Sequence, residues 1–202
     1  MKTIRACFVI LLLAALPQVL SAAPSTKSAA KTYRVSKTYT TLSFTATKWM
    51  VFKEEGTFQD YGGTLTYDPV NPSASSIDVT VQAASLDTRN STRDGVLRSD
   101  DFFDVAKYPT LSFRSTRVTP AGSDSLSVAG DLTIHGVTKQ VTVPVNIVGA
   151  RVMPGIGDFV GFETTFTIDR REFGVLGTRW SGNTVAIDPE VVIHLIIGGV
   201  RE

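Results

Sequence analysis

Three carboxylates stand within five residues of one short segment, and they are the first candidates for chemistry in this chain. The segment "LRSDDFFDVAKYPTLSF", residues 97–113, contains Asp100, Asp101 and Asp104. Asp101 and Asp104 are three residues apart, which places both carboxyls on one helix face, where such a pair can act as general acid and base. The structural interpretation is that acidic residues begin a helix and complement its dipole. One hypothesis is therefore an enzyme that uses Asp101 and Asp104.

Other catalytic or metal-binding residues are scarce. The chain contains two histidines, His135 and His194, and one cysteine, Cys7. No nucleophile–histidine pair lies near the carboxylates in the sequence, and a catalytic zinc site usually takes three protein ligands. We expect His135 to lie in a turn and His194 to be a structural residue on a strand. The sequence therefore predicts no metal site and no cofactor.

Arginines offer a different chemistry, because the planar guanidinium suits a phosphate or carboxylate head group. The candidates are Arg93, Arg98 and either Arg170 or Arg171. The alternative is that each arginine only stabilises a loop by pairing with a nearby acid. The acids available are Asp94, Asp100, Asp104 and Asp169.

Apolar residues exceed what a single tightly packed core would need. Aromatic residues gather near predicted strand ends and around the segment 97–113, and residues 191–197 are apolar on both faces of a strand. This excess favours an elongated apolar tunnel, while dense packing or a dimer interface are the alternatives. The predicted ligand-binding residues are Trp49, Phe52, Phe58, Arg93, Leu97, Arg98, Phe102, Phe103, Tyr108, Phe113, Leu132, Ile134, Phe166 and Phe173.

The elements that must position these residues are mostly strands, because apolar and polar residues alternate along most of the chain. Turn sequences rich in Gly, Pro, Asn, Asp and Ser separate the alternating runs. Eight antiparallel strands are predicted, at residues 32–47, 56–67, 76–86, 110–119, 125–135, 138–149, 158–169 and 184–198. This pattern indicates an all-β fold, an eight-stranded lipocalin-like barrel whose interior is either filled or holds one small ligand.

One segment, at about residues 89–107, breaks the alternation and predicts a short helical insert across the barrel mouth. Asn90 or Ser91 can cap a first helix. Ser99 suits the start of a second helical turn, and Pro109 returns the chain to a strand.

The first residues predict export. Basic residues precede a short apolar run and then small residues, which is typical of a cleavable signal peptide over residues 1–22. Residues 23–31 form a flexible linker and residues 32–199 one domain. Without Lys2 and Arg5 the chain has 18 basic and 19 acidic residues, a formal charge of −1. We therefore expect a periplasmic or secreted protein with no nucleic-acid partner and no stable membrane insertion.

Three motifs make the pattern specific: "LRSDDFFDVAKYPTLSFRS", "VAGDLTIHGVTKQVTVPV" and "IDRREFGV". In this order and at this spacing they resemble the YceI-like family, over roughly residues 32–197. The resemblance implies a lipocalin-like barrel around a long polyisoprenoid or related lipid, a periplasmic location and, as in some relatives, a homodimer. The family often has histidine where "RDGVLRS" has Val96, which implies another polar contact or a less polar ligand.

The leading hypothesis is therefore a non-catalytic protein that binds, transports or sequesters a long amphiphilic lipid, such as a polyisoprenoid, an isoprenoid quinone or a fatty-acid derivative. The alternatives are an enzyme acting on such a lipid through Asp101 and Asp104, and a structural dimerisation module with a solid core.

Overall fold

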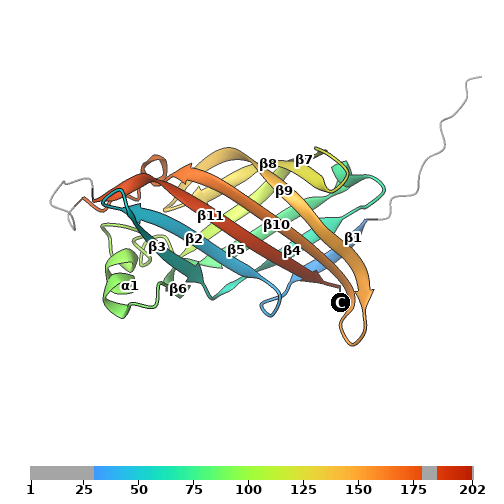
Figure 1. The fold of residues 1–202 in the computed structure, drawn as a ribbon, viewed down its shortest axis with the longest axis horizontal. Coiled ribbons are helices and arrows are strands. Elements are labelled where there is room, and N and C mark those ends of the chain that lie inside the picture. Colours follow the sequence, from blue (N-terminus) through green and yellow to red (C-terminus); the bar gives the residue numbers. More distant parts are fainter. Residues whose placement is uncertain (1–29, 179–185, 202) are drawn as a thin grey trace, which may run out of the picture.

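Antiparallel strands form one sheet that closes on itself around an elongated interior in a computed structural model, which describes residues 30–178 and 186–201 (Figure 1). The strands are β1 (Lys31–Val35), β2 (Thr41–Lys48), β3 (Phe52–Phe58), β4 (Tyr61–Tyr67), β5 (Ser76–Gln82), β6 (Leu86–Asp87), β7 (Thr110–Pro120), β8 (Ser125–Ile134), β9 (Val137–Met153), β10 (Gly157–Asp169) and β11 (Ile187–Val200). The helices are α1 (Ser91–Arg98) and the 3-10 turns η1 (Pro72–Ala74), η2 (Ala83–Ser85) and η3 (Arg170–Phe173).

The eight predicted strands are confirmed as the eight strand positions around the barrel wall, which we call staves. Three of these staves are interrupted. The first is split into β1 and β2, the second into β3 and β4, and the third into β5 and β6. Each half still pairs with the corresponding half of the next stave: β1 with β4, β2 with β3, β4 with β5, and β3 with β6. The long strand β11 pairs with both β1 and β2, and this pairing closes the ring.

Alternation along β8 shows why the sequence forms this wall. Its buried and partly exposed residues alternate at every position, and Leu126, Val128, Leu132 and Ile134 all face inward. Because successive strand side chains point to opposite faces, a two-residue period buries one apolar row and leaves a polar row outside.

The helical insert contains one helix, and the predicted second helical turn does not form. Asn90 caps α1 by accepting a hydrogen bond from the Arg93 backbone N–H at 3.0 Å. After α1, Ser99 adopts an extended backbone conformation and its hydroxyl donates to the Val96 carbonyl at 2.7 Å. Asp104 then takes a left-handed φ of 44°. A side chain that bonds the backbone locally competes with helix formation, so residues 99–107 fold as turns.

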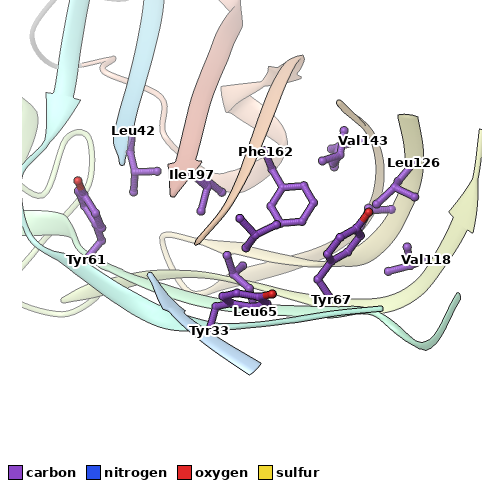
Figure 2. Close-up of a cluster of buried hydrophobic side chains, with 13 residues drawn as sticks. Tyr33, Leu42, Tyr61, Leu65, Tyr67, Val118, Leu126, Val143, Phe162 and Ile197 are labelled. Carbon is purple, nitrogen blue, oxygen red and sulfur yellow. The ribbon is translucent and has the colours of Figure 1, made fainter. Parts of the chain in front are cut away.

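Two apolar clusters fill the two ends of the interior. The larger one lies away from α1 and includes Tyr33, Tyr61 and Tyr67 with neighbouring aliphatic residues. Figure 2 shows the rings of Tyr67 and Phe162 approaching each other, with centroids 5.4 Å apart in an edge-on arrangement. The smaller cluster, near α1, consists of Phe102, Leu132, Ile134, Phe173 and Val175.

No helix among the described residues is long and apolar enough to cross a membrane. The predicted signal peptide, residues 1–22, and nearly all of the predicted linker lie outside the described residues, as do residues 184 and 185 of the last predicted strand.

Candidate ligand-binding cavity

The barrel encloses a cavity of about 220 Å³ between the two apolar clusters. All but four of the residues that line it are apolar. The apolar lining residues are Leu42, Phe44, Ala46, Phe58, Leu65, Ile77, Val79, Val81, Leu97, Phe102, Phe103, Leu111, Phe113, Leu132, Ile134, Val143, Val145, Phe162, Phe166, Ile168, Phe173, Val175, Ile187, Val191, Ile193, Leu195 and Ile197. A cavity lined in this way, of about 150 Å³, stays dry and takes up benzene, so this one is suited to hydrocarbon.

Phe102, Phe103 and Phe173 cover the α1 end of the cavity, and we call them the cap. Phenylalanines form a continuous line from the barrel wall to this cap. Phe44 of β2 lies beside Phe58 of β3, with ring centroids 5.8 Å apart. Phe58 in turn meets Phe103, which belongs to the turns after α1, edge to face at 6.1 Å. Such aromatic pairs add to the free energy of burial because the ring edge is positive and the face negative.

The cap itself depends on a close approach of backbone to ring. Gly177 has a φ of 67°, and a Cβ there would lie 2.4 Å from the Phe102 ring. Its N–H donates to the Asp101 carbonyl at 2.8 Å, which ties the segment after η3 to the turns after α1. Glycine is therefore required at this position, against the buried ring of Phe102.

The four polar residues of the lining are Ser43, Ser112, Thr164 and Arg170. Ser43 donates to the His194 carbonyl at 2.9 Å and Thr164 to the Pro144 carbonyl at 2.5 Å. Both hydroxyls thus satisfy their donors on the barrel wall itself. The cavity presents little hydrogen-bonding capacity to a ligand, so a ligand that fits it must be largely apolar.

Arg170 is a structural clamp at the end of the cavity. Its guanidinium donates to the carbonyls of Asp188, Ile187, Val175 and Leu176 at 2.7–3.0 Å. These bonds join η3 to the beginning of β11 and to the loop after η3. Burial lowers the pKa of Arg170, with the charge of Arg171 acting in the same direction. The neighbouring Arg171 is exposed and pairs with Asp169 at 2.6 Å.

Buried tyrosines close the opposite end of the barrel. The Tyr61 hydroxyl donates to the Thr40 carbonyl at 2.6 Å. Burial raises the pKa of Tyr33, Tyr61 and Tyr67, because a phenolate is poorly solvated in an apolar cluster. The three tyrosine rings pack within the larger apolar cluster and do not line the cavity.

The structure brings nine of the fourteen predicted ligand-binding residues to the cavity wall. They are Phe58, Leu97, Phe102, Phe103, Phe113, Leu132, Ile134, Phe166 and Phe173. The strand residues among them lie on inward-facing positions, and the others lie on α1, the turns after it and η3.

The other five predicted residues lie away from the cavity. Trp49 and Phe52 are exposed at the tip of the β2–β3 hairpin, where the chain reverses direction beyond the barrel wall. Tyr108 packs on His135, with ring centroids 4.4 Å apart. Arg93 bonds to Glu54 and to Thr88. Arg98, the fifth residue, bonds to backbone carbonyls.

Arg98 was predicted as a polar contact to ligand, and the structure turns it to the backbone instead. It donates to the carbonyls of Ala84, at 2.9 Å, and of Leu86. These carbonyls lie where η2 and β6 interrupt the third stave, and they need donors that a continuous strand would have received from its neighbour. Arg98 is therefore occupied by the fold.

Several lining residues were absent from the prediction, notably Phe44, Phe162, Val191, Ile193 and Leu195. Parity along the strand would have found them. Phe44 shares the inward parity of Leu42 and Ala46. Position 96, where the family often has histidine, contributes Val96 to the apolar cluster near α1 and not to the cavity lining.

The two carboxylates that could form an acid–base pair, and both histidines, lie outside the cavity lining. Asp101 and Asp104 lie in the turns after α1, and neither lines the cavity. His194 lies on β11, where it pairs with Glu163 at 2.9 Å, and His135 lies in the β8–β9 turn. Within residues 30–178 and 186–201, no group of three His, Cys, Asp or Glu side chains could hold a metal ion.

Comparison with known proteins places this architecture. Residues 33–197 match the YceI-like domain. The UPF0312 protein of Pseudomonas savastanoi pv. phaseolicola is 41% identical over 133 residues, which are 66% of this chain and 69% of that protein.

Two solved structures share the fold. BcnA of Burkholderia cenocepacia is 27% identical and has a TM-score of 0.74, covering 81% of this chain and 98% of its own. A polyisoprenoid binding domain from Saccharophagus degradans has a TM-score of 0.65 at 16% identity, covering 87% of this chain and 100% of its own, and shows likeness of fold alone. The family match spans the barrel from β1 to β11, so this chain belongs to the YceI-like domain family.

Proposed function

We propose that this protein binds a long amphiphilic lipid in its barrel and carries or sequesters it without changing it chemically. The observation that carries the proposal is the cavity, whose lining is apolar except for four residues, with the donors of Ser43, Thr164 and Arg170 already bonded to backbone carbonyls. The ligands that fit this chemistry are a polyisoprenoid, an isoprenoid quinone or a fatty-acid derivative. The polyisoprenoid binding domain from Saccharophagus degradans, which has the same fold, supports the first of these.

The tail of such a lipid supplies most of the affinity. Each buried CH₂ contributes about 0.8 kcal/mol, whereas a hydrogen bond to the head group contributes only about 0.5–1.5 kcal/mol. Association itself costs on the order of 4–15 kcal/mol. A chain of many carbons overcomes this cost, and the head group fixes orientation at the α1 end.

Lipid entry requires the cap to open. The cavity is smaller than the roughly 300–1,000 Å³ typical of ligand sites. Among the three capping phenylalanines, Phe102 and Phe173 are buried and Phe103 is only partly buried. We infer that Phe103 is displaced when a chain enters, which lengthens the cavity toward the α1 end.

Location and assembly complete the proposal. Residues 1–22 act as a cleavable signal peptide, and the mature protein works in the periplasm or outside the cell. A homodimer would use the exposed apolar side chains on the outer face of β11, Val192 and Ile196. The dimerisation module with a solid core is less well supported, because the described interior contains a cavity.

Native mass spectrometry tests lipid binding directly. Purified protein is incubated with octaprenyl phosphate, an isoprenoid quinone or a C18 fatty acid, and we expect one lipid per barrel with at least one of them. Ile193→Trp fills the cavity and should abolish the complex, whereas Val192→Trp, the adjacent outward-facing position, should keep it. Circular dichroism establishes that both variants fold.

The result that would overturn the proposal is a folded wild-type protein that takes up none of these lipids, or an Ile193→Trp variant that binds as well as wild type. The mass of the released lipid separates a carrier from the enzyme alternative. An unchanged mass after incubation supports a carrier, and a product lost in Asp101→Asn would support the enzyme.

A further inference from the structure

The tip of the β2–β3 hairpin exposes four consecutive large apolar side chains. Trp49, Met50, Val51 and Phe52 are exposed to 55, 85, 70 and 59% respectively. The Trp49 and Phe52 rings lie edge to face with centroids 6.3 Å apart, so they form one surface. Single exposed apolar residues are ordinary on protein surfaces, whereas a contiguous group marks an interaction site.

Turn chemistry does not explain these residues. The Val51 N–H donates to the Lys48 carbonyl at 3.3 Å, and the two central residues both have left-handed φ, 48° at Trp49 and 66° at Met50. Two consecutive central turn residues with positive φ favour Asn-Gly, because these residues tolerate that conformation. Tryptophan and methionine rarely adopt this conformation. The turn therefore forms although Trp49 and Met50 are unfavourable at its two central positions.

Basic residues flank the apolar tip on both strands. Lys48 precedes it, with its Nζ 4.1 Å from the Trp49 ring centroid, and Lys53 follows it. Long lysine side chains lie along apolar surface while their charges reach polar surroundings. An apolar tip with lysines on both sides matches the boundary between lipid tails and anionic head groups.

The two acids that follow the tip in sequence pair with arginines. Glu54 of β3 pairs with Arg93, and Glu55 lies 3.9 Å from Arg89. Both acids thus have an arginine partner from the segment around α1.

The hairpin also adjoins the α1 end of the cavity. The Trp49 N–H donates to the Ala186 carbonyl at 2.9 Å. Lys48 of β2 lies opposite Ile187 of β11 in the sheet, and Ile187 lines the cavity. Figure 1 shows the β2–β3 turn at the same end of the barrel as α1. A surface that meets the tip therefore also faces the cap over the cavity.

We propose that the tip formed by Trp49, Met50, Val51 and Phe52 docks the protein onto an anionic phospholipid bilayer, peripherally, with the cavity end toward the lipid. Tryptophan and phenylalanine enter the interfacial region while Lys48 and Lys53 bind phosphate head groups. The orientation would let a lipid pass between bilayer and barrel, and this transfer role rests on the proposed function. The tip is narrow and convex, which suits a deformable lipid surface.

Sedimentation with vesicles tests the docking. Wild-type protein should bind vesicles of equal parts phosphatidylglycerol and phosphatidylcholine, and bind vesicles of phosphatidylcholine alone more weakly. The double variant Trp49→Asn/Met50→Gly gives the turn its preferred residues, so it should fold while losing roughly tenfold or more in partition. Lys48→Gln/Lys53→Gln should remove the preference for phosphatidylglycerol. Val148→Asn/Val152→Asn, at exposed positions of β9, is the matched control and should bind as wild type.

The proposal is overturned if wild-type protein does not sediment with phosphatidylglycerol vesicles, or if the Trp49→Asn/Met50→Gly variant sediments equally well. The first outcome would point to a protein partner for the tip. Native mass spectrometry of the same variants separates this result from the proposed function. A variant that still takes up lipid but no longer docks supports both proposals, whereas docking without lipid uptake contradicts only the carrier.

Discussion

The Phe103 ring stands edge-on to the Phe58 ring, with centroids 6.1 Å apart and an angle of 86° between the planes. Phe58 ends β3 in the barrel wall, and Phe103 lies in the turns after α1. This contact joins the cap to the wall at the end of the cavity where a lipid would enter. We therefore expect stability and the exchange of the proposed ligand to be coupled at this contact.

Replacing the capping ring should weaken the fold modestly and speed exchange. We expect Phe103→Ala to lower the free energy of unfolding by about 1–3 kcal/mol, less than for a fully buried phenylalanine. It should also raise the rate at which a bound lipid is released, measured by transfer of a fluorescent fatty acid to vesicles. Val70→Ala, at an exposed position away from the cavity and the hairpin tip, is the control and should change the unfolding energy by less than about 0.5 kcal/mol. Slower release from Phe103→Ala would contradict this interpretation of the cap.

Arg170 should matter far more than its neighbour. Arg170→Met leaves four backbone carbonyls without their donor, so we expect a loss of about 2–5 kcal/mol in urea unfolding. Arg171→Met removes only an exposed ion pair with Asp169, which is screened by solvent, so it should cost far less than Arg170→Met. Equal effects of the two substitutions would show that the carbonyl contacts are not what holds η3 to β11.

A carboxylate at the other end of the barrel should make stability depend on acid pH. Asp158 of β10 accepts hydrogen bonds from Lys31 at 2.9 Å and Arg201 at 3.1 Å, and these bonds hold its pKa below the ordinary value of 3.8. A lowered pKa means that the folded state binds the proton less readily than the unfolded state. The stabilisation is therefore present above 3.8 and lost as the pH falls through the folded pKa.

The measurement is urea unfolding of wild type and Asp158→Asn across acid pH. The gap in unfolding free energy between the two proteins should be constant near neutral pH and should shrink on acidification. Asp60→Asn removes an exposed ion pair with Lys37 and serves as the control, with little effect at any pH. A gap between wild type and Asp158→Asn that stays constant down to low pH would show that the carboxylate does not stabilise the folded barrel.

The unusual turn at the hairpin tip predicts a variant more stable than wild type. Trp49→Asn/Met50→Gly relieves two left-handed residues and should raise the free energy of unfolding by about 1 kcal/mol or more. Trp49→Ala/Met50→Ala removes the same side chains but keeps the backbone conformation unfavourable, so it should give no such gain. Thermal unfolding monitored by circular dichroism distinguishes the two. Equal melting temperatures for the two variants would mean that backbone conformation is not what limits stability at the tip.

Alternation predicted the barrel well because inward parity is a local property of a strand. The same rule would have placed Phe44 in the cavity, since it follows Leu42 by two residues. Interruptions of the staves were not predictable, because they depend on which neighbour supplies hydrogen bonds. β1 pairs with β4 and not with the adjacent hairpin of β2 and β3, and both β1 and β2 pair with β11 near the other end of the domain.

Polar candidates were harder to predict than apolar ones. Arg98 was expected at the ligand, yet it bonds to the carbonyls of Ala84 and Leu86 where the third stave is interrupted. Trp49 and Phe52 were expected in the tunnel, yet the turn between them points both side chains outward. Composition indicates that a residue can contact ligand, but a long side chain is directed by whichever acceptor the completed fold leaves open.

Closure of the barrel has a consequence for the order of events in the life of the chain. The ring is completed when Arg34 pairs with Val200 and Val35 with Gly199, residues separated by nearly the whole domain. Contacts of such high sequence separation form late and slowly, because loop entropy is lost before they stabilise anything. The cavity does not exist until the last strand has been added. Under the proposed function, loading with lipid would therefore follow translation and require β11, and a chain truncated before β11 would be both open and empty.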